Sequence, residues 1–195
     1  MARRQKHRQP VIDASVTLFR RRGYAATGLN DIVEASGAPK GSLYHYFPGG
    51  KASIAVAAVE EAGRRVCETL RELAGGKGSA GTLIRAHAEL LARWMASSGF
   101  KDGCPITTVL LELAPANRAV AEAGRKAYAD RLAILRDRLV ADGHSEDRAQ
   151  RLASLCTSAL QGALIESRVQ RSGKPLEIAA QELATMLDGI DIRGI

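Results

Sequence analysis

The stretch TGLNDIVEASGAPKGSLYHYFPGGKASI, residues 27–54, decides the fold of this chain. It predicts two short helices, from about Asn30 to Ser36 and from Pro39 to Phe47, which a break at Gly37-Ala38-Pro39 separates. Thr27 is placed to cap the first of these helices, and proline is tolerated in the first turn of the second. Two short helices joined by a glycine-containing turn indicate a helix-turn-helix motif.

A longer helix is predicted before this pair, from about Gln9 to Arg22. Its apolar residues recur at helical spacing at Ile12, Val16 and Phe19. Gly23 can end this helix because glycine adopts the left-handed conformation without steric cost. Three helices in this order are the outline of a DNA-binding module.

The helix from Pro39 to Phe47 has an apolar side when its residues are placed about 100° apart. That side faces the other two helices and holds Leu43, Tyr46 and Phe47. The outward side holds Gly41 and His45, flanked by Ser42 and Tyr44, and it has no acidic residue. Such a helix is about 13 Å long and a major groove is about 12 Å wide, so the outward side fits a DNA groove.

Gly41 has two interpretations, because a glycine inside a helix costs about 1 kcal/mol relative to alanine. Either the backbone at Gly41 approaches another surface closely, or the first turn of the helix is frayed and tolerates glycine. Lys40 and Lys51 flank the helix at positions suited to phosphates. The hydroxyls of Tyr44 and Tyr46 are long enough to reach the oxygens of a DNA backbone.

Positive charge is concentrated at the amino-terminal end. Residues 1–51 carry nine Lys and Arg against three Asp and Glu, a net charge of +6 out of +7 for the whole chain. The remaining residues carry 19 basic and 18 acidic side chains and are nearly neutral. A polyanion would be attracted to the basic end, although a solvated basic tail explains the charge equally well.

Helical spacing continues along the rest of the chain, and no stretch alternates with the period of two that a strand requires. The later helices are predicted at about 51–74, 82–98, 105–113, 117–141, 146–171 and 176–188. The predicted fold class is therefore all-α, with about nine helices in total. A helix-turn-helix DNA-binding domain is expected at residues 1–53 and a second helical domain at residues 54–195.

Other protein classes receive little support from the sequence. Cys67, Cys104 and Cys156 are far apart and have no CxxC or Cys/His spacing, so no disulfide, metal site or cofactor is expected. Asp13 interrupts any signal-peptide core, and the uncharged run at 152–165 is too short to cross a bilayer, which predicts a cytoplasmic protein without membrane contact. No HExxH, nucleophile elbow or phosphate-binding loop is present, so an enzyme is not expected.

The segment quoted above resembles the amino-terminal module of the tetracycline-repressor (TetR/AcrR) family of transcriptional regulators. The match extends over about residues 9–60, and six residues fall in register with the family pattern: Gly37, Lys40, Gly41, Leu43, Tyr44 and Phe47. The FPGGK ending, together with Gly103-Cys104-Pro105-Ile106, resembles the LmrA/YxaF-like subgroup of that family.

The resemblance implies how the amino-terminal module meets double-stranded DNA. Lys40, Gly41 and Tyr44 would face the major groove, and Thr27 would anchor the second helix on the DNA backbone. The residues that would hold phosphates are Tyr44, His45, Tyr46 and Lys51. With Ser42, which flanks the outward side, the predicted DNA-binding residues are Thr27, Lys40, Gly41, Ser42, Tyr44, His45, Tyr46 and Lys51.

The nearly neutral second domain suits a ligand pocket and a subunit interface better than further DNA contact. The resemblance implies both, an inducer-binding bundle and a homodimer formed by the last two helices. An apolar band along 146–171 needs covering, either by its own domain or by a partner. The inducer is expected to be an apolar or aromatic small molecule. The candidate residues for its pocket are His87, Trp94, Phe100, Cys104, Ile106, Leu110 and Tyr128. The alternative is that these residues simply belong to the hydrophobic core.

The leading hypothesis is a repressor that binds a pseudo-palindromic operator as a dimer and is released by a small-molecule inducer. An alternative is a DNA-binding regulator controlled by a protein partner or by thiol oxidation. Cys104 precedes Pro105 at a predicted helix start, where unpaired amides stabilise a thiolate, but an inert cysteine is the other interpretation. A small all-helical enzyme is a third hypothesis, and no catalytic motif supports it.

Overall fold

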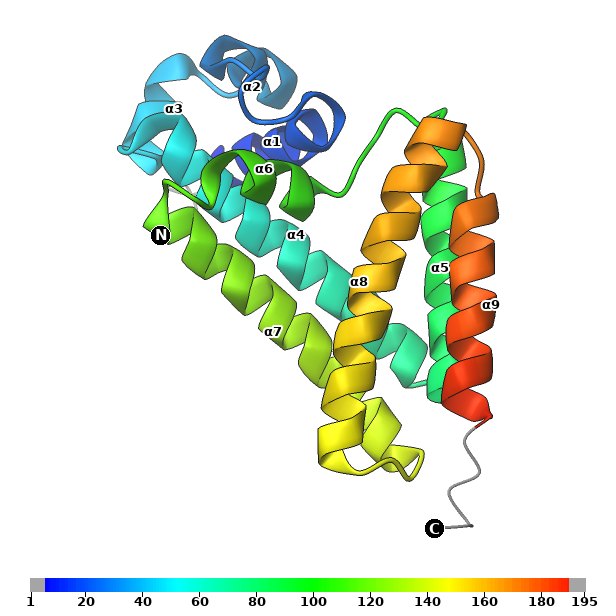
Figure 1. Cartoon of the computed structure of the whole chain (residues 1–195). Coiled ribbons are helices and arrows are strands. Elements are labelled where there is room, and N and C mark those ends of the chain that lie inside the picture. The colour runs from blue at the N-terminus through cyan, green and yellow to red at the C-terminus, as the bar shows by residue number, and fades with distance from the viewer. Residues whose placement is uncertain (1–5, 190–195) are drawn as a thin grey trace. The chain divides into compact units, whose positions relative to one another are not determined.

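The computed structural model describes residues 6–189, and every regular element in that range is an α-helix (Figure 1). The helices are α1 (Arg8–Arg22), α2 (Leu29–Ser36), α3 (Lys40–Tyr46), α4 (Gly50–Ala74), α5 (Ala80–Ser97), α6 (Pro105–Leu113), α7 (Arg118–Ala141), α8 (Glu146–Gln170) and α9 (Lys174–Asp188). The all-α fold class is confirmed, and the predicted bounds agree to within two residues. Helix α3 begins at Lys40 because Pro39 is its N-cap and has an extended ψ of 138°.

The helices form two compact units. The first unit holds the described residues up to Arg65 together with Cys104–Tyr128, and the second holds Val66–Gly103 together with the described residues from Ala129 onward. Helices α4 and α7 therefore each contribute to both units. The predicted boundary between residues 53 and 54 separates a DNA-binding domain from a second domain by their functions. It stays a prediction, and the compact units divide the chain at other positions.

In the first unit, α1 packs against α2, α3 and α6. The apolar residues predicted for α1 are buried, as are Ile32 of α2 and Leu43 and Phe47 of α3. Ile106 and Val109 of α6 belong to the same core, to which α4 and α7 also contribute. The three-helix module is thus completed by helices that follow it in the chain, and it shares one core with them.

The α1–α2 turn, residues 23–27, is closed differently from the sequence prediction. Thr27 does not cap α2, because its hydroxyl donates to the carbonyl oxygen of Gly23 at 2.7 Å and the N-cap residue is Gly28. The amide of Gly28 donates to the Asp31 carboxylate at 2.8 Å, so this end of α2 is capped without Thr27. Gly23 ends α1 as predicted, with a φ of +81° that favours glycine.

In the second unit, α5, α8 and α9 form a bundle in which α9 packs against both other helices (Figure 1). The buried face of α8 includes Leu152, Cys156 and Leu160, and that of α9 includes Leu176 and Leu183. Leu152, Cys156 and Leu160 lie within the apolar band that the sequence predicts along 146–171. The bundle is therefore stabilised mainly by apolar burial.

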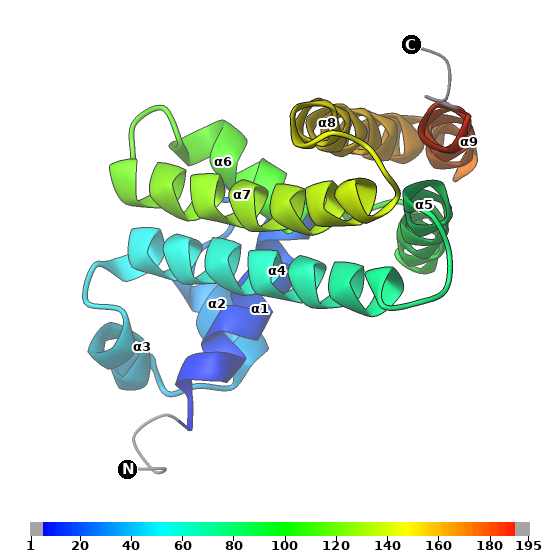
Figure 2. The ribbon, with the colours of Figure 1, turned by 90° about the horizontal axis from the view of Figure 1, so that it is seen from below.

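Helices α4 and α7 approach each other closely within the first unit (Figure 2). A Cβ atom at Gly63 of α4 would lie 2.8 Å from the Cβ and 3.4 Å from the Cα of Ala127 on α7. Ala127 has no flexible side chain that could move aside. A side chain at position 63 would therefore overpack the contact between α4 and α7.

We expect Gly63→Ala to lower the free energy of unfolding by about 1 kcal/mol, because overpacking outweighs the gain in helix propensity. Urea denaturation followed by circular dichroism measures the change. Gly41→Ala in α3 is the matched control, because a Cβ there meets no heavy atom within 4 Å. It should stabilise the protein by up to about 1 kcal/mol. Equal changes in both variants would contradict a close α4–α7 contact.

Candidate nucleic-acid interface

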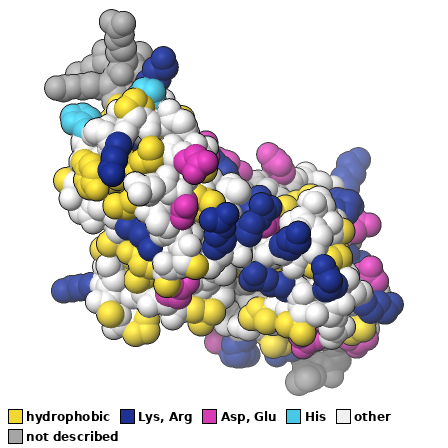
Figure 3. Space-filling model, turned by 90° about the horizontal axis from the view of Figure 1, so that it is seen from above, with side chains coloured by type: hydrophobic (Ala, Val, Ile, Leu, Met, Phe, Trp, Pro, Cys, Tyr) yellow, Lys and Arg dark blue, Asp and Glu magenta, His cyan; other side chains and the backbone are white. Residues whose placement is uncertain are grey.

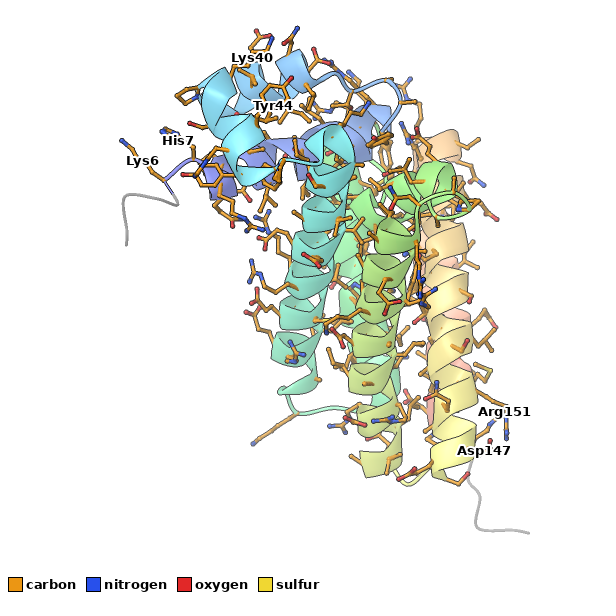
Figure 4. All side chains as sticks on the ribbon, turned by 90° about the vertical axis from the view of Figure 1, so that its left-hand side faces the viewer. Lys6, His7, Lys40, Tyr44, Asp147 and Arg151 are labelled. Atoms are coloured by element: carbon orange, nitrogen blue, oxygen red, sulfur yellow. The ribbon has the colours of Figure 1, made fainter. Side chains whose placement is uncertain are left out.

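Helix α3 presents a polar face to solvent above an apolar base. Its exposed residues are Lys40, Gly41, Tyr44 and His45, whereas Ser42 and Tyr46 are half-buried. Leu43 and Phe47 are buried beneath them, as the helical spacing predicts. Figure 4 shows Lys40 and Tyr44 on this helix, which contains no acidic residue. The face can therefore donate hydrogen bonds to an anion without bringing a negative charge toward it.

Three local contacts lie at the carboxyl-terminal end of α3. The amide of Phe47 donates to the carbonyl oxygen of Leu43 at 2.8 Å. The Arg8 guanidinium lies 5.6 Å from the centroid of the Phe47 ring, within cation–π distance. The His45 ring meets the Tyr46 ring edge-on, with 5.1 Å between centroids. These contacts all lie at the carboxyl-terminal end of α3, where Phe47 is the C-cap residue.

Gly41 has no neighbour within the protein that requires a glycine. A Cβ at this position would meet no heavy atom within 4 Å, and the residue is not among those with positive φ. Neither packing nor backbone strain in the free protein explains the glycine. The open space at Gly41 leaves room for the close approach of another molecule.

Basic residues are numerous near the start of the chain. Lys6 and Arg8 are exposed, and α1 ends with three consecutive arginines, Arg20-Arg21-Arg22. Arg3 and Arg4, which contribute to the positive charge of the sequence, lie outside the described residues. Figure 3 shows Lys, Arg and His side chains on the face seen from above, mixed with apolar and acidic ones. The argument for an anion-binding surface therefore depends on the acid-free helix α3 and not on this face as a whole.

Lys51, predicted to hold a phosphate, is half-buried against the α1–α2 turn. Its Nζ lies 4.1 Å from the centroid of the Tyr24 ring and 3.5 Å from the carbonyl oxygen of Ala25, to which it donates. Partial burial lowers the pKa of Lys51, and the carboxylates of Glu112 and Asp31 oppose that shift. The ammonium is thus engaged within the protein, and its contact with a phosphate stays a prediction.

Thr27, the predicted anchor on the DNA backbone, has a fully buried side chain in the α1–α2 turn. Its hydroxyl already donates a hydrogen bond to the carbonyl oxygen of Gly23. A direct phosphate contact from this residue stays a prediction. What the structure shows is that Thr27 closes the turn that precedes α2.

Sequence reasoning did not single out Glu112 of α6, which contacts the same turn. Its two carboxylate oxygens accept hydrogen bonds from the amides of Tyr24 and Ala25, at 2.7 and 2.6 Å. Burial of the phenol, with the charge of Glu112 as a second cause, raises the pKa of Tyr24. No local pattern could have identified Glu112, because its partners are backbone amides 87 and 88 residues away.

The predicted ligand-binding residues are divided between the two units. His87, Trp94 and Phe100 belong to the second unit, and the other four belong to the first unit. In the first unit, Ile106 is part of the core, and Cys104, Leu110 and Tyr128 pack against it. The assignment of all seven to a pocket therefore stays a prediction, and His87 is the one that lines a cavity inside the second unit.

This cavity has a volume of about 10 Å³, room for about one water molecule. Most of its lining is apolar, and its polar residues include His87, Arg131 and Thr157. Burial, with Arg131 as a second cause, lowers the pKa of His87 to about 3, and burial raises the pKa of Cys156 to about 11. The Thr157 hydroxyl is buried without a hydrogen-bond partner among the described residues. The cavity thus combines an apolar wall with a neutral imidazole and an unsatisfied hydroxyl.

Within residues 6–189, no three His, Cys, Asp or Glu side chains are grouped so that they could hold a metal ion. None of the described helices has the length and apolar character needed to cross a membrane.

Comparison with protein families gives two matches to this chain. Residues 11–58 match the family described as "Bacterial regulatory proteins, tetR family". Residues 80–182 match the domain described as "Transcriptional regulator LmrA/YxaF-like, C-terminal domain". The first match contains α2 and α3, and the second extends from α5 into α9.

Individual proteins match over almost the whole chain. An HTH-type transcriptional regulator of Mycobacterium tuberculosis is 37% identical over 188 residues, 94% of this chain and 95% of the relative. The HTH-type transcriptional regulator LmrA of Bacillus subtilis is 29% identical, over 87% of this chain and 90% of the relative.

Solved structures show the same fold. A TetR transcriptional regulator from Legionella pneumophila superimposes with a TM-score of 0.82 at 17% identity, over 92% of this chain and 96% of that chain. The reduced form of Escherichia coli NemR superimposes with a TM-score of 0.76 at 26% identity, over 91% and 94% of the two chains.

We expect the buried His87 to make the protein less stable as the pH falls below about 6.5. The pKa is lower in the folded state than in the unfolded state, so the unfolded state binds the proton first and stability is lost between pH 6.5 and about 3. The loss should reach about 1.4 kcal/mol per pH unit, and His87→Gln should remove that part of the slope. Urea denaturation from pH 8 to pH 5 measures both proteins.

Comparison at pH 8 is the control, because the imidazole is neutral in both states there and the difference reports only packing. Parallel pH profiles for the two proteins would show that His87 is not buried in its neutral form.

Proposed function

We propose that this chain, which belongs to the tetR family of bacterial regulatory proteins and carries an LmrA/YxaF-like C-terminal domain, is a repressor of transcription. The two matches confirm the family resemblance, and the members of this family are transcriptional regulators rather than enzymes. In the proposed mechanism, a homodimer binds a pseudo-palindromic operator and a small-molecule inducer releases it. A regulator of bacterial operator DNA acts in the cytoplasm, and this localisation is part of the proposal.

The exposed face of α3 is the observation that carries this proposal. It is free of acidic residues, it rests on the buried Leu43 and Phe47, and it includes a glycine with empty space around it. Lys40, Gly41 and Tyr44 are proposed to enter the major groove, with Ser42 beside them. The residues proposed to act at phosphates are Thr27, His45, Tyr46 and Lys51. Phosphate contacts position such a helix, and contacts to base edges give it specificity.

The proposed homodimer is supported by an apolar stripe on α8. The apolar band of this helix has a buried part and an exposed part. Leu152, Cys156 and Leu160 are buried, whereas Leu155 is 48% exposed. Ile165 and Val169 lie along the same exposed side, 55% and 78% exposed. An exposed apolar stripe of this kind needs a partner surface.

A second copy of the chain is the partner that fits this stripe best. Gly162 lies midway between Leu155 and Val169, and a Cβ there would meet nothing within 4 Å. If two α8 helices pair antiparallel about Gly162, the Leu155 of each copy lies opposite the Val169 of the other. A two-fold axis makes such a surface self-complementary, and the glycine allows close approach of the helices. Helix α9 is the other helix predicted to form the dimer, and its Ile178, which is 53% exposed, adds apolar area to the proposed interface.

The cavity beside His87 is the proposed origin of the inducer site. Because it has room for about one water molecule, an inducer must open it, and binding therefore favours a different conformation of the second unit. The inducer is proposed to have an apolar or aromatic body, in keeping with the lining. Coupling to DNA then requires that operator and inducer weaken each other reciprocally.

Thiol oxidation is the second candidate for control. Cys104 is half-buried at the N-cap of α6, whereas Cys67 and Cys156 are buried. Loss of operator binding on oxidation of the wild type but not of Cys104→Ser would favour this candidate over an inducer. If a protein partner alone releases the regulator, neither oxidation nor a small molecule should change operator binding.

We expect Lys40→Ala to weaken operator binding by about 1–3 kcal/mol, because a base contact in the major groove is lost. The operator is first obtained by selecting bound sequences from random duplexes, and affinity is then measured by fluorescence anisotropy. Wild-type affinity should also fall steeply with added salt, since bound cations release counterions from DNA.

Lys77→Ala is the matched control, because Lys77 is exposed in the α4–α5 loop outside the proposed interface. Equal losses in the two variants, or binding that does not depend on salt, would contradict the proposed interface.

We expect Ile165→Glu to convert the protein from a dimer to a monomer, because the buried carboxylate at the proposed interface would lose its hydration. Sedimentation velocity measures the mass of the particle in solution. Leu111→Glu is the matched control: Leu111 of α6 is 73% exposed but lies outside α8 and α9. A wild-type monomer, or an Ile165→Glu protein that remains dimeric, would rule out this interface.

A further inference from the structure

The α1–α2 turn is held by side chains from two helices that come much later in the chain. Glu112 of α6 accepts hydrogen bonds from the amides of Tyr24 and Ala25, one at each carboxylate oxygen. Lys51 of α4 lies over the Tyr24 ring and donates to the carbonyl oxygen of Ala25. The acid thus binds the donors of the turn and the base binds an acceptor.

The backbone of the turn leaves space for this carboxylate. A Cβ atom at Gly23 would lie within van der Waals overlap of Glu112 Oε1. Glycine at this position therefore permits both the positive φ that ends α1 and the close seating of Glu112. Hydrogen bonds from amides to an ionised carboxylate are roughly twice as strong as neutral ones.

We infer that Glu112 is a positioning residue for DNA binding. This inference rests on the α3 interface proposed above. The turn it holds runs directly into α2, because Thr27 closes the turn and Gly28 is the N-cap of α2. Only Gly37, Ala38 and Pro39 then separate α2 from α3. Fixing the amides of Tyr24 and Ala25 therefore fixes where the helix-turn-helix leaves α1.

Electrostatics and positioning predict opposite effects of removing this acid. Glu112 is a negative charge near the basic, DNA-binding end of the first unit, so neutralising it should strengthen attraction to a polyanion. If Glu112 positions the turn, neutralising it reduces the fraction of molecules that are competent to bind, and the apparent affinity falls by that fraction. The sign of the change in affinity decides between the two.

The test compares Glu112→Gln and Glu112→Ala with Glu122→Gln. Glu122 is an exposed residue of α7 in the same unit, paired on the surface with Arg125, so its variant removes one charge without touching the turn. Glu112→Gln keeps one acceptor oxygen and Glu112→Ala keeps none. We expect operator affinity to fall about tenfold in Glu112→Gln and further in Glu112→Ala, with no loss in Glu122→Gln.

Amide hydrogen exchange of Tyr24 and Ala25 provides a readout that does not depend on DNA. Both amides should exchange faster in the Glu112 variants than in the wild type. In Glu122→Gln they should exchange at the wild-type rate. Unchanged exchange would show that the carboxylate does not hold the turn. Faster exchange with undiminished operator affinity would overturn the positioning role. If the wild type prefers no duplex sequence, the proposed function fails, while exchange still tests the contact.

Gly23→Ala tests the same contact from the other side. Its Cβ would displace the carboxylate, and its strain at positive φ is present whether or not Glu112 is there. The loss of operator affinity caused by Gly23→Ala should therefore be smaller in a Glu112→Ala background than in the wild type. Equal losses in the two backgrounds would show that Glu112 is not seated against Gly23.

Discussion

The burial of Leu43 and Phe47 is the constraint on which the proposed DNA-binding surface depends. Helix α3 has seven residues, far fewer than an isolated helix needs to be stable in water. Its exposed face exists because these two side chains fix it to a core that α1, α4, α6 and α7 complete. The helix-turn-helix is therefore not a self-sufficient module. Its stability and orientation depend on residues that follow it by more than fifty positions.

This dependence explains which features the sequence could predict. The sides of α3, the stripes of α1 and the ends at Gly23 and Gly37 depend on helical spacing and on backbone preference within a few residues, so they could be read locally. The position of Thr27 just before α2 predicts a capping role. The structure shows its hydroxyl bonded back to Gly23, since Gly28 and Asp31 already cap α2. Several local solutions satisfy the same amides, and spacing alone does not choose between them.

The contacts made over long sequence distances could not be predicted in this way. Glu112 binds backbone amides, which exist at every residue, so no complementary side chain marks its target. The residues from Cys104 to Tyr128 are predicted to line a pocket with His87 only because they are mostly apolar and follow it in the sequence. In the structure they pack in the first unit, where α6 and α7 complete the core. Hydrophobic spacing identifies a buried face without identifying what buries it.

Glycine residues separate the demands of packing from those of function in this protein. Gly63 faces Ala127 at a distance that excludes a side chain, and Gly23 leaves space for a carboxylate, so both are explained within the folded chain. Gly41 has no such neighbour, although alanine would suit a helix better. A position where the local preference is violated without any gain in the free protein is where a functional requirement is expected. Since Gly41 lies on the exposed face of α3, that requirement is best met by a molecule that approaches the helix backbone itself, as the floor of a DNA groove does.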